Sequence, residues 1–488
     1  MEQLQGLDAS FLSAETPNAP MHVGSLLTFA PPDAGDPFDF DRYRDLMASR
    51  IHVSKVFRQR LATVPLGLGR PFWIQDPTFD VDFHLHHLAL PSPHGMRELS
   101  RLVGRELGRP LDRARPLWEA TFVEGLERVP DTPPGAFAML TKVHHAAIDG
   151  VSGAEILGAF LDTTPEPRAV PADVKWKPGR LPTDADLLRR ATGKVVTEPA
   201  RLAELVTGTV RSALRVGAHW GVNRVELPPL PFRAPRTRFN VPVTPHRVWG
   251  GVVFSLDRIK AVKNAAEGAT VNDVVLAVCA GALRRLLLKE GELPAKPLVA
   301  MTPISVRPEE AKGAMGNQIS AMLVSLATDE PDPRKRLDAI QQGARRSKTY
   351  HHALGARVIM DYAQAIPFAA SGLAARLYTQ LQLSRLHAPI FNVVITNVPG
   401  PQTPLYMGGA RLISNIGAGP IFDGIGLFMP VLSYAGTISI GVTSCREILP
   451  DVEGFCRFLE ESLEELEKAV RPTSKRKSTP PRKPRRPA

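Results

Sequence analysis

The chain has 488 residues, of which 43% are hydrophobic and 22% charged; this is globular composition at a length that favours two domains. The chain has three cysteines, too few for a disulfide framework, and no two of them have the spacing of a metal-binding pair. The first residues lack a secretory signal, so we expect a cytoplasmic protein. The net charge of +11 is not accompanied by a recognition motif for nucleic acid, and we expect no such partner.

In the first part of the chain, apolar patterns predict strands at 20–31 and 72–90, a helix at 96–109 and a strand at 135–145. The stretch FDVDFHLHHLAL, residues 79–90, contains three closely spaced histidines. Its period-two alternation favours a half-buried strand over a metal site, because alternation sends His86 and His87 to opposite faces.

Residues 163–186 are rich in proline and lack periodicity, which indicates a boundary. The following segment, 187–215, has a narrow apolar stripe and an excess of basic residues. It is either an interdomain helix packed on its own protein or a surface helix that lies on a membrane.

The second half repeats the mixture of strands and helices. A helix at 270–291 begins at Thr270, with Asp273 placed as in a capping box. The uncharged stretch 424–445 is long enough to cross a bilayer, but its interruptions and alternation favour two strands around a turn near residue 435. The other predicted elements are strands at 247–256, 297–304, 319–326 and 390–397, and an amphipathic helix at 451–470.

These patterns predict an α+β protein built from two sandwich domains. We place the N-terminal domain at 1–185, a helical and proline-rich linker at 186–245, and the C-terminal domain at 246–470. Residues 471–488 carry eight basic residues, five prolines and no acid, which predicts a disordered tail. This tail either solubilises the protein or is attracted to anionic lipid.

The stretch TKVHHAAIDGVSG, residues 141–153, carries the most chemistry. The motif follows a predicted strand, and Ser152 and Glu155 match a capping box for a following helix. A neutral histidine in such a connection can deprotonate an attacking alcohol, thiol or amine. Asp149 can fix the loop, orient a histidine or pair with an arginine, and Gly150 allows a close approach of the backbone.

A metal site is disfavoured at this motif, because two adjacent histidines seldom reach one metal and a third strong ligand is missing nearby. A covalent nucleophile is also missing beside the histidines, and Cys279 lies in an apolar helix as expected of a core residue. Direct attack by the acceptor substrate is therefore favoured over an acyl-enzyme.

The segment HHAAIDG resembles the HHxxxDG signature of peptide-synthetase condensation domains and of the bacterial wax ester synthase/diacylglycerol acyltransferase family. Other blocks over about residues 1–470 are similar to the second family. They are LDASFLSAETPNAPMHVGSLLTF at 7–29, RPLWE at 115–119, TVNDVVLA at 270–277, PISVRP at 303–308, GNQIS at 316–320 and NVPGP at 397–401.

This resemblance implies two chloramphenicol-acetyltransferase-like sandwich domains joined by a helical crossover, with an active-site tunnel between them. It implies His145 as the general base, His144 as a supporting residue, and Asp149 as a structural residue bonded to an arginine across the domains. Asn272 and Asp273 either shape the site from the second domain or only cap their helix. Asn397 is interpreted as a turn residue and Trp118 as a packing residue.

The resemblance further implies that acyl-CoA is a substrate, that no cofactor is needed, and that the acceptor is diacylglycerol or a long-chain fatty alcohol. It fits peripheral association with the inner membrane face or with lipid inclusions. Two other functions stay open: a free-standing condensation-type enzyme that uses carrier-bound donors, and a non-catalytic protein of lipid surfaces.

Overall fold

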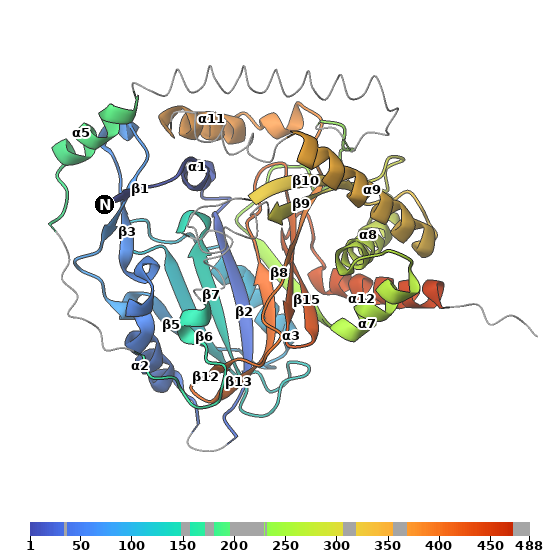
Figure 1. The fold of residues 1–488 in the computed structure, drawn as a ribbon, viewed down its shortest axis with the longest axis horizontal. Coiled ribbons are helices and arrows are strands. Elements are labelled where there is room, and N and C mark those ends of the chain that lie inside the picture. The colour runs from blue at the N-terminus through green and yellow to red at the C-terminus, as the bar shows by residue number, and fades with distance from the viewer. Residues whose placement is uncertain are drawn as a thin grey trace, which may run out of the picture.

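The computed structural model describes residues 1–33, 37–147, 157–170, 180–195, 229, 232–305, 319–354 and 368–471. Within these ranges the strands form two six-stranded sheets and one three-stranded sheet, with helices on their outer sides (Figure 1). The α+β architecture predicted from the sequence is confirmed. The predicted tail beyond Arg471 and the 196–215 part of the predicted amphipathic segment lie outside the described residues.

The first sheet carries the histidine motif. Its two central strands, β2 and β7, are antiparallel, and His22 lies directly opposite His144. Seven of the eight residues of β7 are buried, and the strand is paired with β2 on one side and with β6 on the other. The strand order is β12 (Tyr406–Met407), β13 (Ala410–Ala418), β2 (His22–Ala30), β7 (Phe137–His144), β6 (Trp118–Glu124) and β5 (Leu85–Ala89).

The second sheet lies within the C-terminal half. Strands β14 and β15 form a hairpin whose turn residues, Ala435 and Gly436, have positive φ angles. This hairpin confirms the prediction of two strands in the uncharged stretch, and no described helix is long and apolar enough to cross a membrane. The order is β10 (Ile319–Ser325), β9 (Val299–Ser305), β11 (Val393–Val398), β14 (Leu427–Tyr434), β15 (Thr437–Cys445) and β8 (Arg247–Ser255).

Helix α8 (Val271–Lys289) packs with α7 (Leu256–Ala265), α9 (Pro333–Leu354) and α12 (Val452–Val470), and together they cover the second sheet (Figure 1). Thr270 and Asp273 form the predicted capping box. The remaining described helices are α1 (Gly6–Ala14), α2 (Phe40–Arg50), α3 (Met96–Leu107), α5 (Asp184–Val195) and α11 (Phe368–Gln380). The small sheet consists of β1 (Glu2–Gln3), β4 (Phe72–Gln75) and β3 (Gln59–Ala62).

Two features tie the halves together. Strands β12 and β13 come from late in the chain, yet they complete the first sheet, and β13 also packs on β14 and β15. Helix α3 packs against β8, where the Ser100 hydroxyl donates to the Trp249 carbonyl. Gly104 permits this approach, since a Cβ there would lie 2.7 Å from the carbonyl oxygen of Arg247. The strand end that carries the histidines is therefore set in a framework built by both halves.

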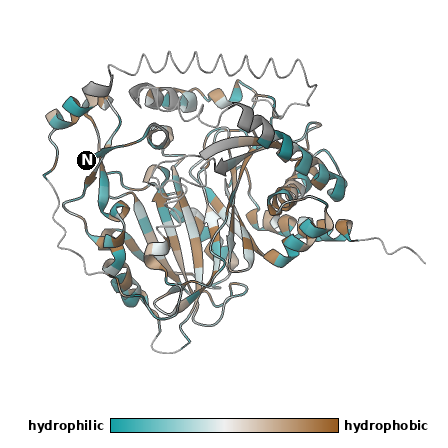
Figure 2. Ribbon diagram, viewed as in Figure 1, coloured by the Kyte–Doolittle hydropathy of each residue, from teal (hydrophilic) through white to brown (hydrophobic). Residues whose placement is uncertain are grey.

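The distribution of apolar and polar residues agrees with this arrangement of sheets and helices. Apolar residues concentrate on the central strands, while α2 and α5 present mostly hydrophilic residues at the periphery (Figure 2). Two large clusters of buried apolar side chains result, one around α8 and the second sheet and one around the first sheet. The second cluster contains Trp249, Ile416 and Tyr434 from the C-terminal half, as the shared strand requires.

The predicted strand over residues 79–90 is partly wrong. Residues Val81–Phe83 form a 3-10 turn, and the strand begins only at Leu85. Alternation over 79–90 also predicts a buried Phe83 and an exposed His84, whereas Phe83 is 52% exposed and His84 is 3% exposed; Leu85 is buried, as the alternation predicts. The side chain of Asp80 accepts from the backbone N–H of Asp82, and this local hydrogen bond stabilises the turn over the alternating strand.

Candidate active site

The two adjacent histidines are held by their backbones at the end of β7. His144 is the last residue of the strand, and its N–H donates to the Leu117 carbonyl at 2.9 Å. His145 begins a 3-10 turn, His145–Ala147, and its N–H donates to the Met21 carbonyl at 2.8 Å. Bonds to chain segments on both sides make this strand end a rigid base for the side chains.

The ring of His145 stacks on the ring of Phe11 from α1, with centroids 3.8 Å apart and planes inclined by 15°. Burial lowers the pKa of His145 to about 4; contact with its own backbone opposes this shift, and neighbouring His144 adds to it. The residue as a whole is only partly buried. His145 is therefore neutral near pH 7 and has an imidazole nitrogen available to accept a proton.

His144 has a different environment, since its side chain is fully buried. The backbone N–H of Ala146 donates to Nδ1 at 3.0 Å, so the hydrogen of the neutral ring resides on Nε2. That nitrogen faces Glu15, at 3.5 Å from Oε2. The two histidines therefore have different environments, and the unequal roles assigned to them stay a prediction.

Glu15 follows α1 directly and is held by Arg113. The Arg113 Nε donates to Glu15 Oε2 at 2.7 Å, and its Nη2 donates to the Leu12 carbonyl at 2.9 Å. Burial alone raises the pKa of the Glu15 carboxyl, but His144 and Arg113 together outweigh it and hold that pKa at about 2. A carboxylate therefore lies beside His144 at every pH at which the protein is expected to work.

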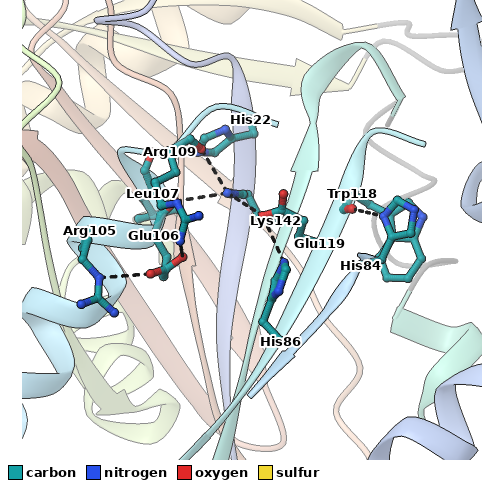
Figure 3. A network of polar contacts seen from close by, with 10 residues as sticks. All are labelled: His22, His84, His86, Arg105, Glu106, Leu107, Arg109, Trp118, Glu119 and Lys142. Carbon is teal, nitrogen blue, oxygen red and sulfur yellow. Dashed lines mark hydrogen bonds and ion pairs between the residues drawn. The ribbon is translucent and has the colours of Figure 1, made fainter. Parts of the chain in front are cut away.

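A second polar network lies under the motif, at the end of α3 (Figure 3). Lys142, two residues before His144, is 3% exposed and lies 2.8 Å from Glu119 Oε2. Its Nζ also donates to the carbonyls of Glu106 and Arg109. The ring of His22 bonds the Leu107 carbonyl at 2.9 Å, and burial, followed by the charge of Lys142, lowers the pKa of His22 to about 3.

The predicted residues of the second half lie at the start of α8. Asp273 caps the helix, because its Oδ2 accepts from the Thr270 N–H at 2.9 Å and from the Thr270 hydroxyl at 2.8 Å. Asn272 is directed elsewhere, and its Oδ1 accepts from Asn397 Nδ2 at 3.2 Å. The interpretation of Asn397 as a turn residue is wrong, since Asn397 lies within β11 and cross-links that strand to α8.

Several further predictions concern residues near the motif. Asp149 and Gly150, and the capping residues Ser152 and Glu155, lie outside the described residues, so their roles stay predictions. Trp118 is a packing residue as predicted: it is 2% exposed, and its Nε1 donates to the Phe57 carbonyl. Across the described ranges, no group of three or more His, Cys, Asp or Glu side chains is arranged to hold a metal.

Sequence reasoning did not identify Phe11, Glu15 and Arg113. Glu15 is separated from His144 by 129 positions, and no local pattern links the two. The sequence signal for two of them is the block at 7–29, which contains both Phe11 and Glu15.

A cavity of about 280 Å³ lies close to this region. Ala14, the residue before Glu15, forms part of its wall, together with Tyr378 and Ile390 from the segment around α11. Helix α11 packs on α1, and α1 in turn packs on the 3-10 turn of the motif. Helix α1 therefore connects the wall of the cavity to the turn that begins with His145.

The whole fold is similar to that of the condensation domains of peptide synthetases. The first condensation domain of the calcium-dependent antibiotic synthetase superposes with a TM-score of 0.53 at 16% identity, covering 96% of each chain. At that identity the likeness shows the fold alone.

The chain belongs to the wax ester synthase/diacylglycerol acyltransferase family, and it is therefore an acyltransferase. The family's catalytic domain matches residues 4–275, and its C-terminal domain matches residues 315–467. A family member from Marinobacter aquaeolei VT8 has a similar structure, with a TM-score of 0.69 and 32% identity over 96% of this chain and 99% of the other.

Two curated relatives span nearly the whole chain. A Mycobacterium tuberculosis protein, provisionally named a diacylglycerol O-acyltransferase, is 35% identical over 469 residues, which is 96% of this chain and 90% of the relative. The O-acyltransferase WSD of Acinetobacter baylyi is 34% identical over 475 residues, which is 96% of this chain and 98% of the relative.

Proposed function

We propose that this acyltransferase moves a long-chain acyl group from acyl-CoA to the hydroxyl of diacylglycerol or of a long-chain fatty alcohol, with His145 as general base. The observation that carries the proposal is the ring of His145: it is neutral, rigidly mounted, and stacked on Phe11 at 3.8 Å. The names of the relatives support the substrate class. Acyl-CoA is a substrate in this scheme, and the reaction needs no cofactor.

The proposed chemistry balances within one proton cycle. The imidazole of His145 takes the hydroxyl proton while the oxygen attacks the thioester carbonyl, and a tetrahedral oxyanion forms. Its collapse breaks the carbon–sulfur bond, and the imidazolium returns the proton to the CoA thiolate. A positioned base contributes roughly 10²–10⁴-fold to such a step, and orientation of the substrates contributes more.

The test is a two-substrate assay with palmitoyl-CoA and either diacylglycerol or hexadecanol, in which released CoA and the lipid product are both measured. We expect His145→Ala to lower kcat by about 10²–10⁴-fold. His246→Ala is the matched control, since His246 is an exposed histidine that pairs with Glu447, and it should keep wild-type turnover. Near-wild-type kcat in His145→Ala would disprove the assignment of the base, and turnover only with carrier-linked acyl donors would disprove the donor class.

We also propose that the protein binds lipid surfaces peripherally through the α11 face. Residues 368–392 contain Arg376 and Arg385 but no acid, a balance that complements anionic headgroups. An apolar stripe at four-residue spacing runs along α11 and continues into the next loop. Its exposed members are Leu373, Leu377, Leu381, Leu386 and Ile390.

This location fits the proposed substrates, because Ile390 also lines the cavity beside Ala14. An acceptor dissolved in a lipid surface would then have a short route toward α1 and His145.

Co-sedimentation with phosphatidylcholine vesicles, with and without phosphatidylglycerol, measures the binding. We expect Leu373→Gln combined with Leu381→Gln to weaken binding at least about tenfold, because two exposed leucines lose their burial in lipid. The control combines Leu288→Gln with Leu68→Gln, two comparably exposed leucines on other surfaces. Equal loss in both pairs, or unchanged binding in the first, would refute the assigned face.

A further inference from the structure

We propose that Glu15 is a positioning residue for acyl transfer, holding the ring of His145 through three separate contacts. The inference rests on the proposed role of His145 as general base. Glu15 touches neither substrate nor the reacting nitrogen in this scheme; it acts through His144, through Met21 and through Phe11.

The first contact fixes the strand end. The carboxylate of Glu15 faces Nε2 of His144 at 3.5 Å, while Nδ1 of the same ring accepts the Ala146 N–H at 3.0 Å. Both ring nitrogens of His144 thereby face polar groups, and one of these groups is the N–H of Ala146, the residue after His145. The 3-10 turn His145–Ala147 cannot rotate without losing one of these contacts.

The second contact passes through the backbone of Met21. Glu15 Oε1 accepts the Met21 N–H at 3.3 Å, and the Met21 carbonyl accepts the His145 N–H at 2.8 Å. Glu15 and His145 are thus joined across a single residue. A shift of the carboxylate would be passed to the backbone of the base through two hydrogen bonds.

The third contact joins Glu15 to Phe11, whose ring stacks on His145. The backbone N–H of Glu15 donates to the Phe11 carbonyl at 3.1 Å, and this bond closes the last turn of α1. Phe11 lies one turn earlier and stacks on His145. The side chain of Glu15 anchors this helix end to β7, and so fixes the plane against which the imidazole rests.

Arg113 keeps Glu15 in place as an anion. It donates to the carboxylate from Nε at 2.7 Å and reaches the Leu12 carbonyl with Nη2, so it also grips α1. The Glu15 side chain is 7% exposed, whereas that of Arg113 is 46% exposed. Arg113 is therefore the member of the set that can be changed with the least effect on folding.

The experiment compares kcat, KM for acyl-CoA and the melting temperature in Glu15→Gln, Phe11→Leu, the double variant and Arg113→Gln. We expect Glu15→Gln to lower kcat about 10–100-fold with KM within about twofold, because the base is misplaced while substrate contacts remain. The losses in Glu15→Gln and Phe11→Leu should combine to less than their product, since both act on the same ring. Glu127→Gln, which alters an exposed glutamate paired with His94, is the matched control and should change none of these values.

Three results would overturn the inference: unchanged kcat in Glu15→Gln, losses that multiply fully in the double variant, or a rise of KM with constant kcat. If Glu15→Gln does not fold, Arg113→Gln decides the question, with an expected several-fold fall of kcat at constant melting temperature. Unchanged kcat in that variant would then refute the role. Loss of turnover in His145→Ala with normal turnover in Glu15→Gln would refute this inference alone and leave the proposed function intact.

Discussion

Replacement of Lys142 by methionine tests the buried network beneath the motif. The ammonium group lies 2.8 Å from Glu119 Oε2 and donates to the carbonyls of Arg109 at 3.0 Å and Glu106 at 3.3 Å (Figure 3). Methionine fills a similar volume but provides no donor. The variant therefore removes the cation from the carboxylate of Glu119 in β6 and from two carbonyls at the end of α3.

The size of the effect follows from these partners. Removal of one member of a buried ion pair costs about 3–5 kcal/mol, and the lower end applies here because Glu119 is 24% exposed and partly hydrated. We expect Lys142→Met to lower the free energy of unfolding by about 3 kcal/mol. Lys142→Met combined with Glu119→Gln should recover part of this loss, since the uncompensated charge is removed.

Equilibrium urea unfolding followed by tryptophan fluorescence measures the change, and Trp118 reports locally because it precedes Glu119 in β6. Lys55→Met is the control: Lys55 pairs with Glu2 at 3.0 Å, but both side chains are about half exposed, so a cost of at most about 1 kcal/mol is expected. A cost for Lys142→Met no larger than that of the control would refute the reasoning that burial makes this pair important.

Three further predictions concern protonation and the second half. The free energy of unfolding should fall as pH drops from about 6.5 toward 4, because burial lowers the pKa of His22 to about 3 and that of His145 to about 4. In this range the unfolded chain binds protons that the folded chain does not bind. Thermal melts across this range test the prediction, and a constant melting temperature would contradict it. The acid limb of log(kcat/KM) should lie near pH 4, where His145 becomes protonated, and a limb near 6.5 would argue against His145 as the base. Asn272→Ala should cost about 1 kcal/mol by removing the bond to Asn397, and a double-mutant cycle with Asn397→Ala should show that the two losses are not additive.

The parts of the fold that sequence predicts well are those in which local signals agree. Thr270 and Asp273 cap α8 as their spacing indicates, and the apolar residues of α3 at Leu99, Leu102, Val103 and Leu107 are all buried. These features depend on contacts within one turn or one helix face. The sequence pattern alone therefore determines them.

Other parts depend on contacts between distant segments. The pairing of β13 with β2 joins residues near 415 with residues near 27, and nothing in either strand records its partner. The 3-10 turn at Val81–Phe83 arises because the Asp80 side chain bonds the local backbone, a choice that an alternating pattern does not reveal. Such errors are expected wherever a side chain competes with the backbone for hydrogen bonds.

The same distinction applies to the site. The position of a histidine pair at the end of a strand can be predicted from the residues themselves. The environment of the two histidines is contributed in part by Phe11 of α1 and by Glu15, the residue after α1, and both reach the motif only in the folded protein. Sequence reasoning could rank the two histidines only by resemblance.

It matters chemically which of the two histidines lies next to Glu15 and which lies next to Phe11. A carboxylate in contact with a histidine favours the imidazolium, which cannot accept a proton. Here the carboxylate of Glu15 faces His144, while His145 faces the apolar ring of Phe11, and burial holds the pKa of His145 at about 4. The two adjacent histidines thus differ in what they contact. His144 lies against the carboxylate of Glu15, which holds the end of the strand in place, while His145 lies away from that charge and stays neutral.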